Sequence, residues 1–285
     1  MSEKKRLRRD RRSDTPPKMR LTERDVDILK AVAEYRILRQ DHIQQLFFGS
    51  KSTAQYRLSH LYQHGFLNRH FLPVYAGWSP TLYTLDKRGV ALLKAACGID
   101  RVNLWDAENG HEFLSHTLAI NNFRVAVTVA CRQAGYTLAQ WIGEASLKAD
   151  YDRVTITAPN GKKQSVSLIP DSYFTIETPK GRASFFLEMD MGTMTLGRFQ
   201  NKIRAYLAYL ESKAYQQRYQ TRSLRVLTVT TSAARSANLK AATEHIHRER
   251  LFWFTHQALV TVDQVLHAPI WQLVGQEVQL PLIPR

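Results

Sequence analysis

The feature that most constrains this chain is a series of three short helix patterns within residues 21–98. The first pattern begins at Thr22, a residue type that caps helices, and its apolar residues recur at spacings of three and four. The second pattern is shorter and ends at Gly49, because glycine commonly terminates helices. In the third pattern, Ser52 and Gln55 have the spacing of a capping box, which predicts a helix start there.

Two extended runs follow the helices, between Leu67 and Leu85, around the turn-rich sequence YAGWSP. Runs of this kind, separated by turn residues, predict a β-hairpin. Three short helices followed by a two-stranded ribbon predict a winged helix-turn-helix, whose third helix enters the major groove of DNA. The third helix is expected to turn Tyr56, Leu58, Leu61 and Tyr62 toward a core.

The remaining face of the third helix should be polar, with no acidic residue near its start. Such side chains bond phosphates and base edges, so double-stranded DNA is the expected partner. A three-helix domain with a hairpin also serves as a dimerisation or protein-docking unit, and this alternative stays open. The expected DNA contacts are Lys51, Ser52, Thr53, Gln55, Tyr56, Arg57 and His60 in the helix, and Arg69, His70 and Tyr75 in the wing.

The charge balance favours the same partner. The 285 residues include 40 Lys and Arg against 25 Asp and Glu, a net charge of +15 that suits a polyanion. Residues 1–20 hold nine basic and three acidic side chains and almost no apolar ones. Such a segment cannot bury enough surface to fold alone, so it is expected to be a disordered basic arm. The arm would clamp the DNA backbone or, as the alternative, would only increase solubility.

The length suits two domains, each able to bury its own core. No apolar run reaches eighteen residues, so no membrane span is expected, and the two cysteines, Cys97 and Cys131, predict reduced thiols in a cytoplasmic protein. The expected parts are a basic arm (1–20), a winged helix-turn-helix (21–100), a linker (101–110), an α/β domain (111–275) and a tail (276–285).

The predicted second domain contains a helix, several strands, and then helices and strands in alternation, so the whole chain is expected to have an α+β fold. One group of acidic residues stands out within it. Asp171 begins a predicted strand, and Glu188 and Asp190 lie two apart on the next strand, hence on one face of the sheet. Three converging carboxylates would form an oxygen site suited to Mg²⁺.

This order of an Asp after a Pro, a hairpin, and a Glu-x-charged sequence resembles the PD-(D/E)XK nuclease superfamily. The resemblance implies a metal site at Asp171, Glu188 and Asp190 and a catalytic lysine that aids charge stabilisation. Asp190 stands where the superfamily pattern has that lysine, so Lys202 or Arg198 on the following helix would have to supply the cation. The alternative is a structural cluster of carboxylates and cations in a nuclease-like domain without activity, which is the favoured interpretation.

A closer resemblance covers nearly the whole chain, from about Leu21 to Trp271. The ordered blocks LTERDVDILKAVAEYRILRQDHIQQLFFGS, PDSYF, FFLEMDMGTM, RFQNKIRAYLAY and VLTVTTS are similar to the bacterial plasmid replication-relaxation family. This resemblance implies an association with plasmids and mobile elements and a winged-helix DNA-binding half.

Together these observations predict a sequence-specific double-stranded DNA-binding protein of a plasmid or mobile element, acting in replication, transfer or transcription control. The alternatives are a metal-dependent endonuclease that uses Asp171, Glu188, Asp190 and Lys202, and a scaffold that docks a relaxase or replication initiator. DNA binding is expected to need no cofactor, whereas cleavage would need Mg²⁺. A homodimer is an expectation from the frequency of dimers among winged-helix proteins alone.

Overall fold

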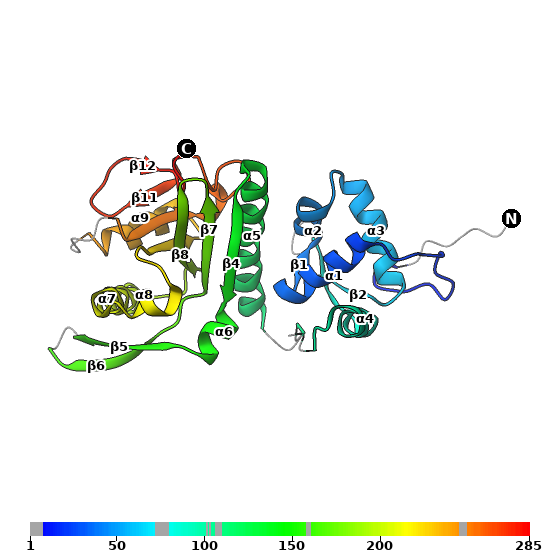
Figure 1. Cartoon of the computed structure of the whole chain (residues 1–285), viewed down its shortest axis with the longest axis horizontal. Helices are drawn as coiled ribbons and strands as arrows, with labels where there is room; N and C mark the ends of the chain where they lie inside the picture. Colours follow the sequence, from blue (N-terminus) through cyan, green and yellow to red (C-terminus); the bar gives the residue numbers. More distant parts are fainter. Residues whose placement is uncertain are drawn as a thin grey trace. The chain divides into compact units, whose positions relative to one another are not determined.

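The structure of the protein is a computed structural model. It describes residues 8–71, 80–100, 102, 104–105, 110–157, 161–244 and 250–285. The chain forms two compact units, residues 1–121 and 122–285. Helices and sheets occur in both, so the architecture is α+β (Figure 1). In the described part of the chain, none of the helices has the combination of length and apolar character that a membrane crossing requires.

The division between the units falls inside helix α5 (His111–Ala134), whereas the sequence predicts a boundary at residues 101–110. Asn121 accounts for part of this difference. Its Nδ2 donates hydrogen bonds to the backbone oxygens of Tyr35 and Ile37, at 3.1 and 2.6 Å. These bonds tie the first half of α5 to the first unit, so the unit extends beyond the expected linker.

In the described part of the first unit, a short strand separates the first two of three helices, and a strand pair and a fourth helix follow the third (Figure 1). The middle strand of its sheet, β3, pairs antiparallel with β1 on one side and β2 on the other. The sequence predicts the first three helices and the β2–β3 pair but not β1 or α4. Its described elements are α1 (Glu23–Tyr35), β1 (Leu38–Arg39), α2 (Gln40–Phe47), α3 (Lys51–Gln63), β2 (Leu67–Phe71), β3 (Thr81–Leu85) and α4 (Lys87–Cys97).

Helix α1 begins as the sequence predicts, after Thr22, whose backbone N–H donates to Asp25 Oδ2 at 2.7 Å. Its buried face includes Ile28, Leu29 and Val32, each with no exposed surface. Burying an aliphatic side chain of this size contributes about 1.5–3 kcal/mol, so this face is a main source of stability in the unit.

Helix α3 differs from its prediction at both its start and its core face. Ser50, rather than Ser52, caps it, because Ser50 Oγ accepts the Thr53 N–H at 3.2 Å. Ala54 and Leu58 are fully buried, whereas Tyr56 is 65% exposed, so the prediction that Tyr56 faces the core is wrong. The reason is helical geometry, since two positions correspond to a rotation of about 200° and place Tyr56 opposite Ala54.

Helix α4 follows Asp86, whose side chain accepts the Lys87 N–H at 2.7 Å. It packs closely against the segment between α3 and β2 at Gly89. A Cβ added at Gly89 would lie 2.3 Å from the backbone oxygen of Phe66, so no larger residue fits without a backbone shift. The helix ends at Gly98, which adopts a left-handed conformation with φ of 64°.

The second unit is built on a seven-stranded mixed sheet, in the order β12-β11-β10-β9-β8-β7-β4, and a separate two-stranded ribbon, β5–β6 (Figure 1). Strands β8, β9 and β10 are parallel, and the other sheet pairs are antiparallel. After α5, its described elements are β4 (Thr137–Gly143), α6 (Glu144–Ala149), β5 (Asp152–Thr157), β6 (Lys163–Leu168), β7 (Ser172–Thr178), β8 (Gly181–Asp190), α7 (Leu196–Ser212), α8 (Ala214–Tyr219), β9 (Arg225–Thr230), α9 (Ala233–Ala241), β10 (Phe252–His256), a 3-10 turn (Gln257–Leu259), β11 (Trp271–Leu273) and β12 (Gln279–Leu280).

Alternate residues of the central strands bury aromatic rings on both faces of this sheet. On one face, Phe123 of α5 lies 5.7 Å from Phe174 and 6.4 Å from Trp271, between ring centroids. On the other face, Phe186 contacts Tyr206 of α7 and Tyr219 of α8, at 5.7 and 5.3 Å. The sheet is therefore covered on both faces, as in α/β sandwiches.

The last part of the chain is more structured than the sequence predicts. Strands β11 and β12 extend the sheet beyond β10, which the sequence treats as the final strand. Within the expected tail, Leu282 is fully buried, and Arg225 Nη1 donates to its backbone oxygen at 2.9 Å. Both cysteines are free thiols, and burial raises the pKa of Cys131 to about 12, so this thiol stays protonated and unreactive.

Candidate nucleic-acid interface and carboxylate cluster

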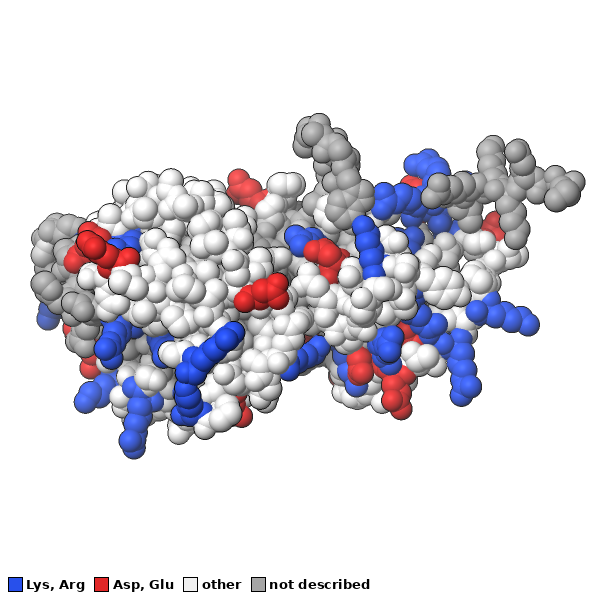
Figure 2. Space-filling view, turned by 90° about the horizontal axis from the view of Figure 1, so that it is seen from above, with Lys and Arg blue, Asp and Glu red and all other residues white. Residues whose placement is uncertain are grey.

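The first turns of α3 present the polar face that the sequence predicts. Lys51, Ser52, Thr53 and Gln55 are exposed, and Tyr56 lies beside them. The side chains can donate or accept hydrogen bonds, and the first turn holds no acidic residue. Figure 2 shows scattered groups of Lys and Arg side chains on the face in view and fewer groups of Asp and Glu, in keeping with the net charge of +15.

Two residues expected on that face have other positions. His60 is only 8% exposed, and its Nδ1 lies 2.9 Å from the backbone oxygen of Tyr56. Arg57 forms a two-point ion pair with Asp25, which has no exposed surface, and donates to the backbone oxygen of Arg20 at 2.7 Å. Burial opposes ionisation of Asp25, but hydrogen bonds from Arg57 and Thr22 outweigh it and lower the pKa of this carboxyl. Arg57 thus ties α3 to α1.

A surface cavity of about 730 Å³ lies beside the start of α3. Tyr56 forms part of its wall, and the guanidinium of Arg24 lies 5.4 Å from the ring of Phe48 at another part. The cavity joins the starts of α1 and α3 in one concave surface. Its lining residues are Thr22, Glu23, Arg24, Asp25, Phe48, Thr53, Tyr56 and Arg57.

The predicted wing residues lie on β2 or outside the described residues. The guanidinium of Arg69 lies over the rings of Tyr62 and Tyr83, at 4.4 and 5.7 Å. His70 Nε2 lies 2.8 Å from Thr84 Oγ1, and burial lowers the pKa of this histidine, which favours the neutral ring. Tyr75 lies outside the described residues.

Residues 8–20 form no helix or strand, but they contact the rest of the first unit at several points. Arg12 Nε donates to the backbone oxygen of Tyr62 at 2.8 Å, and its guanidinium pairs with Asp86 and lies 4.8 Å from the Tyr62 ring. The Tyr62 hydroxyl donates to the Asp10 backbone oxygen at 2.8 Å, and His64 Nε2 lies 2.8 Å from the oxygen of Pro17. The sequence predicts disorder through residue 20 because this segment has almost no apolar residues. The contacts of residues 8–20 are polar and join positions that are distant in the chain, so no local pattern reveals them. Residues 1–7 lie outside the described part.

In the second unit, Glu188 lies at the centre of a buried polar cluster. It is 5% exposed, and its two carboxylate oxygens bond to Lys202 Nζ and to the Tyr206 hydroxyl, both on α7. Burial raises the pKa of Glu188 to about 7, with the charge of Asp171 adding to the shift and Lys202 opposing it. Lys202 and Tyr206 are four positions apart and share one helix face, a spacing that could have identified Tyr206 from the sequence.

Asp190 has a different partner, although it lies on the same face of β8. Arg235 of α9 donates to both of its carboxylate oxygens, at 2.8 and 3.0 Å, and Asp190 is 6% exposed. No local signal links these positions, which are 45 residues apart in the chain. Asp190 therefore belongs to an ion pair between β8 and α9.

Asp171 lies close to Glu188, because its Oδ2 accepts the backbone N–H of Met189 at 2.7 Å. The three carboxylates implied as a metal site thus have separate protein partners. Among the described residues, no three His, Cys, Asp or Glu side chains are grouped as ligands for one ion. With its oxygens bonded to Lys202 and Tyr206, Glu188 does not fit an Mg²⁺ site in this arrangement.

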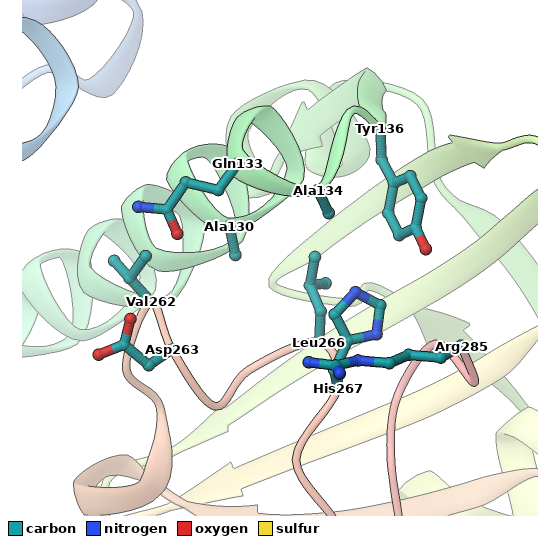
Figure 3. Close-up of a pocket in the computed structure, with 9 residues that line it drawn as sticks. All are labelled: Ala130, Gln133, Ala134, Tyr136, Val262, Asp263, Leu266, His267 and Arg285. Carbon is teal, nitrogen blue, oxygen red and sulfur yellow. The ribbon is translucent and has the colours of Figure 1, made fainter.

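A second cavity, of about 420 Å³, lies at the C-terminal end of α5 (Figure 3). His267 and Arg285 are among the residues that line it. His267 Nδ1 lies 2.9 Å from the Ile283 backbone oxygen, which holds its ring in place. The lining residues are Ala130, Gln133, Ala134, Tyr136, Val262, Asp263, Leu266, His267 and Arg285, a mixed set without convergent catalytic groups.

Comparison with known proteins identifies the family of this chain. Neither the curated proteins nor the solved structures contain a match to the chain. A protein-family model described as replication-relaxation matches residues 29–224, from the middle of α1 to the segment before β9. The match includes α3 and the Glu188–Lys202 pair and extends over more than half of the sequence. The chain therefore belongs to the replication-relaxation family.

Proposed function

We propose that the first unit binds double-stranded DNA through the exposed N-terminal half of α3, as a winged helix-turn-helix does. The observation that carries the proposal is the face formed by Lys51, Ser52, Thr53 and Gln55, which is exposed, able to form hydrogen bonds and free of carboxylates. Side chains of these types read base edges and phosphates in the major groove. The three-helix order and the antiparallel β1-β3-β2 sheet support it, because they match the arrangement that presents a third helix to DNA.

Within this proposal, α3 supplies the base contacts and neighbouring segments supply phosphate contacts. Arg57 is not among the base contacts, because its guanidinium is bonded to Asp25. Binding of this kind needs no metal or other cofactor. Membership of the replication-relaxation family supports a role in replication or transfer of a plasmid or mobile element, with transcription control at the bound site as a further consequence.

The proposal is tested by selecting duplexes from a random pool with the full-length protein and measuring affinity for selected and random DNA. Gln55→Ala should weaken binding to the selected site by about 1–3 kcal/mol and affect random DNA much less, because a base contact is lost. Gln133→Ala, an exposed glutamine on α5, is the matched control and should change neither affinity. Equal losses on both DNAs would assign Gln55 to the phosphate backbone, and no loss on either would contradict the proposal.

The basic segment before α1 is proposed to add phosphate contacts that do not depend on sequence. Deleting residues 1–20 should weaken binding to all duplexes and flatten the dependence of log K on log salt, by close to one unit for each lost contact. An unchanged slope would show that the segment only solubilises the protein. Since Arg12 contacts Tyr62, the thermal stability of the truncated protein must be measured alongside its affinity.

The endonuclease and docking-scaffold interpretations are the alternatives to this proposal. Incubation of supercoiled plasmid with the protein and Mg²⁺, with Glu188→Gln as the control, distinguishes the endonuclease from DNA binding alone. Metal-dependent nicking that Glu188→Gln abolishes would establish cleavage. The pairing of Glu188 with Lys202 leads us to expect intact plasmid.

A further inference from the structure

The β5–β6 ribbon of the second unit has two unlike faces. Its strands pair antiparallel in a regular register, with Val154 opposite Val166 and Thr155 opposite Ser165. Because side chains alternate along a strand, every second residue points to the same side. Val154, Ile156 and Leu168 on the inner side belong to the core beneath α7, and the outer side is exposed.

The outer face carries only basic and hydroxyl side chains. On β5 these are Arg153, Thr155 and Thr157, and on β6 they are Lys163, Ser165 and Ser167, all exposed. The one acidic residue of the two strands, Asp152, lies on the inner side. There it accepts a hydrogen bond from the Tyr209 hydroxyl at 2.6 Å and pairs with Arg218 at 3.1 Å.

We propose that this outer face is a second DNA-contacting surface, one that binds duplex DNA without regard to sequence. The inference deepens the proposed function and rests on it for the identity of the ligand. Each six-residue strand is about 20 Å long and the two strands are about 4.8 Å apart. A two-stranded ribbon of these dimensions fits the major groove, which is about 12 Å wide, or lies along its phosphate edges.

The chemistry of the face favours a duplex over other polyanions. Arginine, lysine and the hydroxyls of threonine and serine are side chains that bond DNA phosphates. Proteins that bind single strands stack bases on aromatic rings, and the outer face itself has none. Tyr151, at its base, is already engaged, because Arg153 Nη2 donates to its hydroxyl at 3.0 Å.

The test removes the charges of this face and, in a matched control, the same charges elsewhere on the unit. Arg153→Gln with Lys163→Gln is compared with Lys180→Gln with Arg222→Gln, since both control residues are exposed and lie outside the ribbon. For random-sequence duplex at ~0.1 M salt, the ribbon variant should lose affinity on the order of tenfold for each contact, and its salt slope should fall by about two. The control should have a smaller loss.

A second variant is needed in case the charges of Arg153 and Lys163 only attract DNA at long range without contacting it. Ser165→Asp places a carboxylate in the middle of the exposed face without altering the core, so it should weaken duplex binding while the melting temperature stays unchanged. Equal losses in the ribbon and control variants, together with wild-type binding by Ser165→Asp, would overturn the proposal and leave a solvated face. Greater losses for single-stranded oligonucleotides, or for vesicles of phosphatidylserine and phosphatidylcholine, than for duplex would also overturn it.

The readouts separate this inference from the proposed function of α3. Gln55→Ala is judged by the ratio of affinities for selected and random DNA, whereas the ribbon variants are judged by the affinity and salt slope on random DNA. If Gln55→Ala lowers the ratio of affinities for selected and random DNA while the ribbon variants bind as wild type, the proposal for α3 is supported and the proposal for the ribbon is refuted. If the ratio is unchanged in Gln55→Ala while the ribbon variants lose affinity for random DNA, the proposal for α3 is refuted and the ribbon remains as the contact surface.

Discussion

Replacing Lys202 with Met tests whether the Glu188 cluster is a buried, charge-balanced part of the fold. Methionine keeps much of the lysine side-chain volume but leaves Glu188, which is 5% exposed, without its cation. Breaking a buried pair by removing one partner costs about 3–5 kcal/mol when the remaining group is charged. The cost should therefore depend on whether Glu188 is ionised.

The pH dependence follows from the pKa of Glu188, which burial raises from 4.5 to about 7. A carboxyl whose pKa is raised in the folded state stabilises the folded protein fully below pH 4.5. This stabilisation is lost as the pH rises through about 7. At about 1.4 kcal/mol per pKa unit, this loss amounts to about 3 kcal/mol in the wild-type protein. Without Lys202 the pKa rises further, so the loss continues above pH 7.

Urea unfolding followed by tryptophan fluorescence, between pH 5 and pH 8.5, measures this effect, since Trp141, Trp253 and Trp271 report on the second unit. We expect Lys202→Met to destabilise the protein by about 3 kcal/mol or more at pH 8.5 and much less at pH 5, where Glu188 is neutral. Arg198→Met, an exposed cation on the same helix, is the matched control and should have a small effect at both pH values. An equal loss for Lys202→Met at pH 5 and pH 8.5 would refute the reasoning, because lost packing alone gives that result.

Three further outcomes are expected. Arg235→Ala should lower the unfolding free energy by about 3–5 kcal/mol, because Asp190 would stay buried without a cation, and adding Asp190→Asn should recover most of it in urea titrations. Arg57→Ala should lower the melting temperature and weaken binding to selected and random DNA alike, and a loss confined to selected DNA would instead make it a base contact. Mg²⁺ or Mn²⁺ should leave the melting temperature nearly unchanged, because the carboxylates are already bonded, and a rise that Asp171→Asn removes would reveal a metal site.

Local patterns in the sequence predicted most of the secondary structure. Helix patterns identified α1, α2, α3, α5, α7 and α9, and alternating or β-branched runs identified β4 to β10. These signals are readable because spacing and caps act over a few residues. The strands β1 and β12 have two residues each, too few to show a period, and only pairing with a neighbouring strand defines them.

Tertiary structure decided which polar residues lie together. The sequence predicted that Glu188 and Asp190 lie on one strand face and that Lys202, on the following helix, could supply a cation near them. In the folded protein, Glu188 pairs with Lys202 of α7, and Asp190 pairs with Arg235 of α9. The two carboxylates therefore have different cationic partners.

The same distinction holds for the face of α3 that is proposed to bind DNA. Composition indicated a basic protein, and the residue pattern of the third predicted helix indicated a polar start to α3. Only the fold showed that Arg57 is bonded to Asp25, 32 positions away, while Gln55 stays exposed. Spacing along the chain determines which side chains share a helix or strand face, but the partner across a contact depends on how distant elements pack, and no local pattern encodes that.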